Sequence, residues 1–122
     1  MRCTSCYYGI NLKSEVFELD KEMMKGSIDL LILTLIEKED MYGYDISSKI
    51  KTLSDDTYEM SEGTLYAALK RMERKSWIES YWLETESGRR KYYKMTKDGT
   101  KELSKKQDNW RWMDQLIRKS AE

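Results

Sequence analysis

The chain of 122 residues contains no histidine and no proline, and its 22 basic residues balance its 22 acidic ones. This length suits one compact domain, with or without an interaction arm. The absence of histidine removes the commonest general base and the commonest protein metal ligand. The remaining carboxylates, lysines, tyrosines and two cysteines form no recognisable catalytic constellation. We therefore expect a protein that is not an enzyme and that needs no cofactor or metal.

The charge is distributed unevenly along this neutral chain. Residues 86–106 hold eight basic and three acidic side chains, and this local excess predicts a basic patch. The longest apolar run, residues 28–36, is interrupted by Asp29 and Thr34 and is far shorter than the roughly 20 residues that cross a membrane. The N-terminus lacks a continuous apolar signal segment. We therefore expect a cytoplasmic, bacterial-type protein with no membrane partner.

Residues 1–22 show no sustained hydrophobic period, and we expect a weakly structured or partly helical N-terminal extension there. The adjacent Met23 and Met24 offer an alternative start of the natural chain. Cys3 and Cys6 form a C-x-x-C pair, which is half of a zinc site at most. A four-thiolate site shared by two chains and a redox pair are alternatives, but reduced thiols are the default in this compartment.

Two helices are expected next. Ser27 can cap a helix over residues 27–38, in which apolar side chains recur at helical spacing. Residues 42–44 predict a turn, and residues 45–53 predict a second, shorter helix. Residues 54–56 then form a loop, and residues 57–60 suit a short extended piece.

The third expected helix has the strongest local signals. Ser61 is a good N-cap, with Thr64 at the N3 position. Leu65, Leu69 and Met72 form a buried stripe. Most basic side chains lie off this stripe and give the helix a solvated, basic side: Lys70, Arg71, Arg74 and Lys75.

Two strands and a long helix complete the pattern. Residues 78–84 and 89–95 predict a hairpin whose turn, residues 86–88, contains glycine. Thr96 can cap a helix of about two dozen residues, weakly interrupted at Gly99. This helix carries apolar residues that a small domain cannot cover: Leu103, Trp110, Met113, Leu116 and Ile117.

The predicted order of elements is therefore that of an α+β, mainly helical, winged helix-turn-helix fold. Residues 23–95 form the expected DNA-binding domain, and residues 96–122 form a C-terminal dimerisation helix. A second copy of the chain is the simplest partner for the apolar face of that helix.

Four motifs resemble the PadR family of bacterial transcriptional regulators. They are the K-G-S segment of residues 25–27 with the leucine-rich helix that follows, Y-G-Y-D-I at 42–46, E-G-T-L-Y with L-K-R-M-E at 62–73, and G-R-R-K-Y-Y at 88–93. Their order and spacing agree with the family over roughly residues 22–118. The chain departs from many members at Ala67, where they have proline, and at Ser76, where they have glycine. The resemblance implies a dimeric repressor of transcription.

The resemblance assigns DNA contacts to two segments. The third helix presents its N-terminus to the major groove, and the wing reaches the minor groove or the backbone. The expected DNA-binding residues are Ser61, Gly63, Thr64, Tyr66, Lys70, Arg71, Gly88, Arg89, Arg90 and Lys91. Alternation along the strand turns Arg89 and Arg90 to opposite faces. Each segment also has an alternative role without DNA contact. The third helix would be an ordinary capped amphipathic helix, Tyr66 would pack in the core, and the wing would be a solvated, charged turn.

The single C-terminal helix is similar to a small subgroup that includes a lactococcal multidrug-sensing repressor. In that subgroup, a tryptophan from each subunit stacks on planar aromatic drugs at the dimer centre. The resemblance implies a ligand site of Trp110, Asp114, Asp29, Gln107 and Met113. Asp29 and Gln107 stand where that relative has asparagine and phenylalanine, which changes the expected range of ligands. Packing at the dimer interface is the alternative role of Trp110.

Two functions are consistent with these patterns. The first is a dimeric, sequence-specific repressor that binds operator DNA and is relieved by a small aromatic ligand in the dimer interface. The second is a dimeric winged-helix module that binds a protein or a ligand but no operator DNA, since the net charge is zero and the first third of the chain is acidic.

Overall fold

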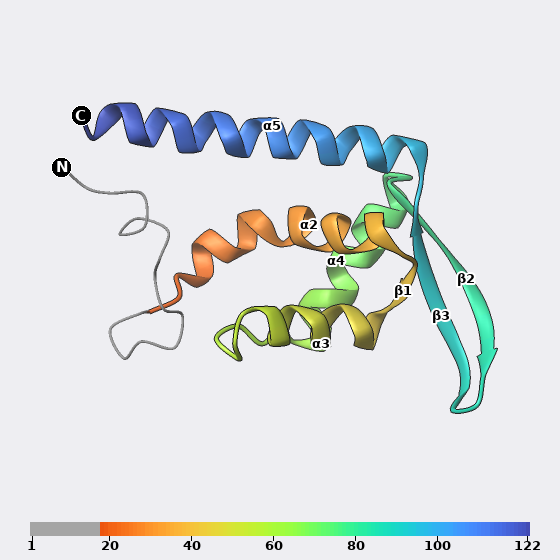
Figure 1. The fold of residues 1–122 in the computed structure, drawn as a ribbon. Coiled ribbons are helices and arrows are strands. Elements are labelled where there is room, and N and C mark those ends of the chain that lie inside the picture. Colours follow the sequence, from red (N-terminus) through yellow and green to blue (C-terminus); the bar gives the residue numbers. More distant parts are fainter. Residues whose placement is uncertain (1–17) are drawn as a thin grey trace.

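The computed structural model describes residues 18–122. Its elements in chain order are α2 (Lys21–Lys38), β1 (Met41–Tyr42), α3 (Gly43–Leu53), α4 (Glu62–Arg74), β2 (Ile78–Thr85), β3 (Gly88–Met95) and α5 (Lys97–Ser120). Figure 1 shows α2, α3 and α4 on one side of a small sheet and α5 running alongside α2. The predicted α+β winged helix-turn-helix fold with a long terminal helix is thereby confirmed.

Helix α2 begins earlier than its apolar period suggests. The side chain of Asp20 accepts a hydrogen bond from the amide of Glu22 (2.9 Å) and caps the helix. Ser27 lies inside the helix, where its hydroxyl donates to the carbonyl of Met23 (3.3 Å). The predicted start at Ser27 is therefore wrong. The first turns are largely exposed and polar, so no apolar period marks them.

The predicted turn at residues 42–44 is also wrong. Met41 and Tyr42 form a short strand that pairs with Tyr93 and Tyr92, and α3 begins directly at Gly43. The partner strand lies some fifty residues further along the chain, so no local pattern reveals it. The extended piece predicted at residues 57–60 is not a strand in the structure, although Met60 from this segment is buried.

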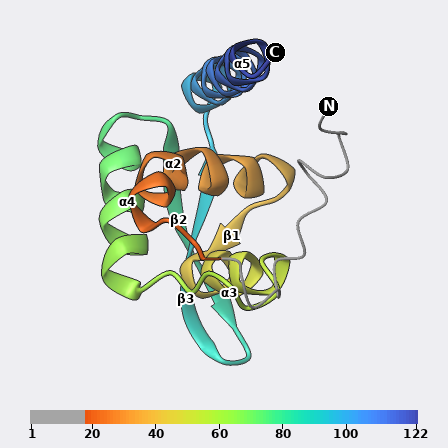
Figure 2. The same ribbon diagram turned by 90° about the vertical axis from the view of Figure 1, so that its left-hand side faces the viewer.

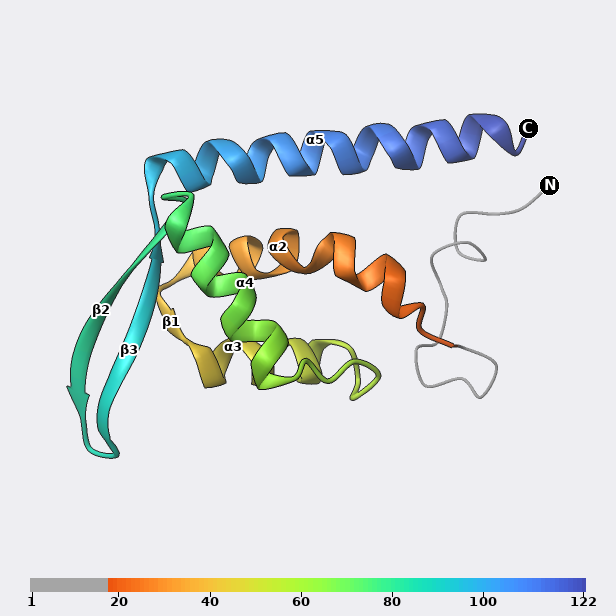
Figure 3. The ribbon, with the colours of Figure 1, turned by 180° about the vertical axis from the view of Figure 1, so that it is seen from behind.

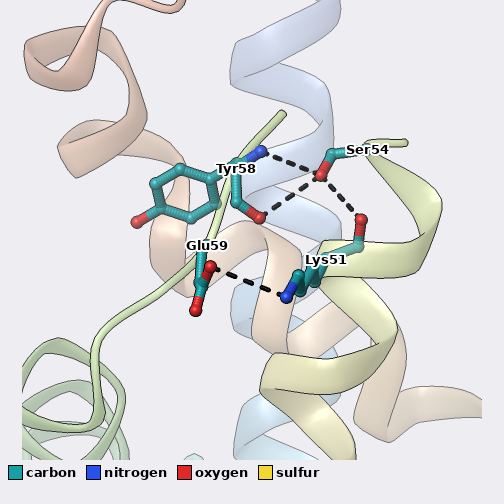
Figure 4. Close-up of polar contacts among 4 residues, drawn as sticks. All are labelled: Lys51, Ser54, Tyr58 and Glu59. Atoms are coloured by element: carbon teal, nitrogen blue, oxygen red, sulfur yellow. Dashed lines mark hydrogen bonds and ion pairs between the residues drawn. The ribbon is translucent and has the colours of Figure 1, made fainter. Parts of the chain in front are cut away.

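The connection between α3 and α4 is held by a compact set of polar contacts (Figure 4). The amide of Tyr58 donates to the hydroxyl of Ser54 (3.0 Å), and this hydroxyl lies within donating distance of the carbonyls of Lys51 (3.0 Å) and Tyr58 (3.3 Å). The ammonium group of Lys51 pairs with Glu59 at 3.6 Å. These contacts hold the loop that leads directly into the cap of α4.

The sheet is antiparallel, with the strand order β1-β3-β2. Strands β2 and β3 pair from Ile78↔Met95 to Thr85↔Gly88, so Glu86 and Ser87 alone form the turn between them. Gly88 follows at φ 110°, a conformation that favours glycine. The predicted hairpin is therefore confirmed, and Figure 2 shows it projecting away from the helices as a wing.

One core joins all the helices to the sheet. Its fully buried members are Ile32, Leu33, Ile36, Ile46, Leu65, Leu69, Met72, Ile78 and Leu103. The predicted stripe of α4, Leu65 with Leu69 and Met72, is thus confirmed. The ring of Tyr93 closes the core from β3, and its burial raises the pKa of the phenol.

Helix α5 starts at the base of the wing. The hydroxyl of Thr96 accepts a hydrogen bond from the amide of Gly99 (3.0 Å), which confirms the predicted cap. The helix continues through Gly99 without a break, so the predicted interruption is wrong. Leu103 is its last buried residue. Figure 3 shows that α5 runs alongside α2 and that its C-terminal end projects beyond α2. No helix within residues 18–122 combines the length and apolarity needed to cross a bilayer.

Candidate nucleic-acid interface

The N-terminus of α4 is an open, capped helix end. The hydroxyl of Ser61 accepts from the amide of Thr64 (3.2 Å) and donates to the hydroxyl of Thr64 (3.0 Å). Both predicted contact residues therefore serve the cap as well. Gly63 is exposed, and a methyl group at its position would meet no atom within 4 Å. This end of the helix thus offers amide groups and small side chains to an approaching anion or groove.

Tyr66 links α4 to the start of α3. Its hydroxyl lies over Gly43, where a Cβ atom would stand only 2.5 Å away. The side chain of Tyr66 remains 47% exposed. The alternative that Tyr66 packs in the core is therefore wrong: the end of its ring lies against the start of α3, and much of the side chain faces solvent. A residue larger than glycine at position 43 would displace the end of the Tyr66 ring.

The two adjacent cations of α4 lie in different surroundings. Lys70 is exposed and forms no ion pair with any residue of the described chain. The guanidinium of Arg71 donates to the carboxylate of Asp29 on α2. Lys70 is therefore available to a phosphate, whereas Arg71 is engaged within the protein.

The wing directs its cations to both faces of the hairpin. The guanidinium of Arg89 lies 4.8 Å from the ring centre of Trp82, and that of Arg90 lies 4.4 Å from the ring centre of Tyr42. In the register of the strands, Trp82 and Tyr42 belong to opposite faces of the sheet. The predicted divergence of Arg89 and Arg90 is confirmed. These cation–π contacts hold the guanidinium groups themselves, and neither group has a carboxylate partner in residues 18–122.

A hollow of about 460 Å³ lies between the wing and the helices α3 and α4. It is lined by Tyr42, Gly43, Tyr66, Trp82, Arg90, Lys91 and Tyr93. Four of these seven residues are aromatic, and the two cationic ones have no carboxylate partner within the described chain. Three predicted DNA-binding residues, Tyr66, Arg90 and Lys91, meet in this one hollow.

Sequence reasoning did not find Tyr42, Gly43, Trp82 and Tyr93 as parts of the site. The glycine between two tyrosines at 42–44 was a usable signal, since a glycine beside a helix start can mark a close approach of another chain segment. Trp82 was hidden because strand alternation alone does not show which face of a hairpin meets the helices.

The outer face of the sheet carries stacked tyrosines. The rings of Tyr81 and Tyr92 stack at 5.9 Å, and Tyr42 lies 5.6 Å from Tyr92. The phenol of Tyr81 donates to the carboxylate of Asp40 (2.6 Å). This hydrogen bond, which requires the neutral phenol, raises the pKa of Tyr81 to about 12. These contacts join β1 firmly to the wing.

The predicted ligand residues of α5 follow one stretch of that helix. Trp110 and Met113 are about half exposed, whereas Gln107 and Asp114 are partly buried. The carboxylate of Asp114 accepts a hydrogen bond from Arg118 (3.0 Å) on the next turn. Asp29, the fifth predicted ligand residue, is paired with Arg71 of α4. Each predicted ligand carboxylate therefore already neutralises a cation of the same chain.

Metal binding finds no support in the part of the chain that the structure describes. Residues 18–122 hold no group of three or more cysteine, aspartate or glutamate side chains placed to bind a metal ion. Cys3 and Cys6 lie outside the described residues, so their thiol roles stay predictions.

Comparison with known proteins identifies the family. Residues 32–105 match the model of the transcriptional regulator PadR-like family. A transcriptional regulator from Clostridium thermocellum has a similar structure, with a TM-score of 0.74 and 37% identity over 80% of this chain and 96% of its own. A PadR family transcription regulator from Clostridium difficile gives a TM-score of 0.70 and 38% identity over 80% of this chain and all of its own.

A further relative comes from Lysinibacillus sphaericus. This uncharacterized protein X is 36% identical over 97 residues, which cover 79% of this chain and 89% of the relative. Family and structural neighbours are regulators of transcription, in agreement with the prediction that the protein is not an enzyme. With most of its described length matched, the chain belongs to the PadR-like family of transcriptional regulators.

Proposed function

We propose that this regulator is a homodimeric repressor that binds operator DNA through the N-terminus of α4 and the wing. The observation that carries the proposal is the hollow at which these two elements meet, whose cations Arg90 and Lys91 have no carboxylate partner within residues 18–122. Figures 1 and 2 show the start of α4 and the tip of the wing on the same side of the molecule, opposite α5. A duplex can therefore meet both elements at once.

The hollow suits the sugar–phosphate backbone. If α4 enters the major groove and the wing reaches the neighbouring minor groove, one strand must pass between them. Lys91 then faces a phosphate, and the phenol of Tyr66 can donate to one of its oxygens. The guanidinium of Arg90 lies over Tyr42 on the other face of the wing, where it can reach the backbone from the outside. Such contacts position the protein, whereas Ser61, Gly63 and Thr64 at the helix end lie nearest to the base edges.

The exposed apolar residues of α5 favour a dimer. Gly99 and Leu103, which are buried, share one helix face with Trp110, Met113 and Ile117, since successive residues turn by about 100°. The face that packs on the domain in the first half of α5 therefore continues, half exposed, through the second half. A second copy of the same helix would cover it and would present two α4 helices to successive major grooves.

The proposal also includes a small-molecule ligand in the dimer interface. A planar, cationic aromatic molecule could stack on Trp110 beside Asp114, and it would relieve repression if it binds better to a dimer whose heads are wrongly spaced for DNA. Quenching of tryptophan fluorescence by ethidium tests this site. Trp110→Ala should abolish the quenching and preserve DNA binding, while Trp112→Ala serves as the control. Loss of both activities in Trp110→Ala would indicate a purely structural role.

The DNA-binding proposal is tested by selection from a random duplex library, followed by fluorescence anisotropy at several salt concentrations. We expect a motif with two-fold symmetry and an affinity that falls steeply with salt as counterions are re-bound. Enrichment of no sequence, with weak and equal binding to all duplexes, would contradict the proposal and favour the module that binds a protein instead.

A matched pair of variants tests whether the duplex meets the hollow. Lys91→Gln removes a cation from the hollow, whereas Lys97→Gln removes an exposed one at the start of α5. The slope of log affinity against log salt should decrease by about 0.9 for each phosphate that the Lys91→Gln protein no longer neutralises, and it should not change in Lys97→Gln. Equal slopes for both variants would place the duplex elsewhere. Repression itself is checked by transcription in vitro from a promoter that contains the selected motif.

A further inference from the structure

One ion pair ties α4 to α2, the helix alongside which α5 runs. Arg71 of α4 donates to the carboxylate of Asp29 of α2, with the side chain of Asp29 only 17% exposed and that of Arg71 42% exposed. The other ion pairs within residues 18–122 join neighbouring turns of one helix, paired strands, or α3 to its following loop. The Asp29–Arg71 pair alone connects two helices of the described chain.

The pair lies far from the end of α4 that faces DNA. Arg71 is in the last turns of the helix, and the ten residues that separate it from Ser61 span about 15 Å. On nearly the opposite side of α4, Glu73 accepts a hydrogen bond from the hydroxyl of Ser80 on β2 (2.6 Å). The C-terminal half of α4 is therefore anchored by polar contacts to α2 and to the wing.

We propose that Asp29 and Arg71 are positioning residues for DNA recognition: their ion pair sets the angle between α4 and α2. This inference rests on the proposed function. Apolar contacts between α2 and α4 are non-directional, whereas a charged hydrogen bond restrains orientation. Over a lever of about 15 Å, a tilt of about 4° moves the first turn of α4 by about 1 Å. A shift of this size disturbs the alignment of a side chain with a base edge.

The inference gives Arg71 a role different from that of Lys70. A phosphate contact by Arg71 would contribute to counterion release and hence to the salt dependence of binding. A positioning role would affect base readout and leave the salt dependence unchanged. Loss of either member of the pair should then have the same effect, because each removes the same restraint.

The experiment measures affinity for the selected duplex and for its scrambled counterpart, at several salt concentrations and well below the unfolding temperature. The variants are Asp29→Asn, Arg71→Gln, the double variant, and the exchanged pair Asp29→Arg with Arg71→Asp. Glu22→Gln is the matched control, since it breaks an exposed ion pair with Lys25 on the same helix. Lys70→Gln reports the loss of an exposed cation on α4. Thermal unfolding of each variant is recorded separately.

We expect either single variant to reduce the preference for the selected duplex by about fivefold to tenfold, with an unchanged salt slope. The double variant should be no worse than the singles, and the exchanged pair should recover much of the preference. Glu22→Gln should behave as wild type. A general loss of stability alone would lower the unfolding temperature and leave the preference of the folded protein intact.

Two results overturn the inference while the proposed function stands. One is a lower salt slope in Arg71→Gln with full preference retained in Asp29→Asn, which would make Arg71 a phosphate contact. The other is an unchanged preference in both single variants. If the wild-type protein itself fails to prefer any selected duplex, the proposed function fails first, and the role of the pair in recognition fails with it.

Discussion

At the scale of single residues, the end of α4 shows why many members of the family have glycine at one position where this chain does not. Ser76 stands where many members have glycine, and its φ of 63° is in the left-handed region. The amides of Ser76 and Trp77 donate to the carbonyls of Glu73 and Met72, each at 3.0 Å, which is the Schellman arrangement at a helix C-terminus. A residue with a Cβ atom is strained in that position, and glycine is not.

Ser76→Gly should therefore stabilise the protein by up to about 1 kcal/mol. Ser48→Gly is the control, because Ser48 is an exposed residue inside α3, where glycine costs about 0.5–1 kcal/mol. Urea unfolding followed by circular dichroism gives both values. The two substitutions should have opposite signs, and a destabilised Ser76→Gly would contradict this account of the turn.

Replacing Gly63 by alanine should have opposite effects on stability and on DNA binding. Space around it is open, so Gly63→Ala should raise stability by about 0.5 kcal/mol through helix propensity. If bases or backbone approach this glycine closely, the added methyl group should weaken DNA binding by about tenfold, or about 1.4 kcal/mol. Anisotropy and thermal unfolding measure the two effects separately. Gly26→Ala, another open helical glycine, should raise stability without affecting DNA affinity.

At the scale of elements, local signals predicted what is local. The Ser61 and Thr96 caps and the stripe of Leu65, Leu69 and Met72 were all correct, because each depends on residues within a turn or two. The start of α2 and the strand at Met41–Tyr42 were missed. A polar helix turn has no apolar period, and a two-residue strand exists only through its partner Tyr92–Tyr93.

In the candidate site, too, the local features were predictable from the sequence and those that depend on packing were not. The exposed start of α4 and the basic wing were predictable from capping and charge. The hollow between them was not, because it depends on how α3, α4 and the hairpin pack together. The ion pair between Asp29 and Arg71 spans 42 positions and has no local signature. The family resemblance assigns both residues to external partners, a ligand and DNA, rather than to each other.

The junction between the wing and α5 depends on Gly99. A Cβ atom there would lie 1.9 Å from the carbonyl oxygen of Trp77 and 2.6 Å from the sulfur of Met95. Gly99→Ala should therefore destabilise the protein by about 1–3 kcal/mol, although alanine is the better helix former. Thermal unfolding of Gly99→Ala is compared with that of Gly26→Ala, where the added methyl group meets open space. The comparison separates the cost of steric crowding from the gain in helix propensity. Similar gains in stability for both variants would show that the junction tolerates a methyl group.

At the scale of the whole molecule, the second half of α5 is the part whose surface least suits a monomer. Trp110, Met113, Leu116 and Ile117 are 43–49% exposed and follow one another along about two turns. Clustered apolar surface of this kind marks an interface in soluble proteins. The domain formed by the remaining elements has its own core, so loss of the interface should leave the fold intact.

Ile117→Lys should convert the proposed dimer to a folded monomer, because a lysine in the centre of an apolar helix interface must be desolvated without a partner. Gln115→Lys, which changes an exposed residue on nearly the opposite face of the same helix, should stay dimeric. Sedimentation over a range of concentrations measures the association, and circular dichroism confirms the fold. The monomer should bind a half-site with the affinity of a single head and should lose the large gain that two linked heads provide. Tight binding of a full two-fold site by a monomeric Ile117→Lys variant would show that α5 does not join the two heads, and a dimeric Ile117→Lys would place the interface on another surface.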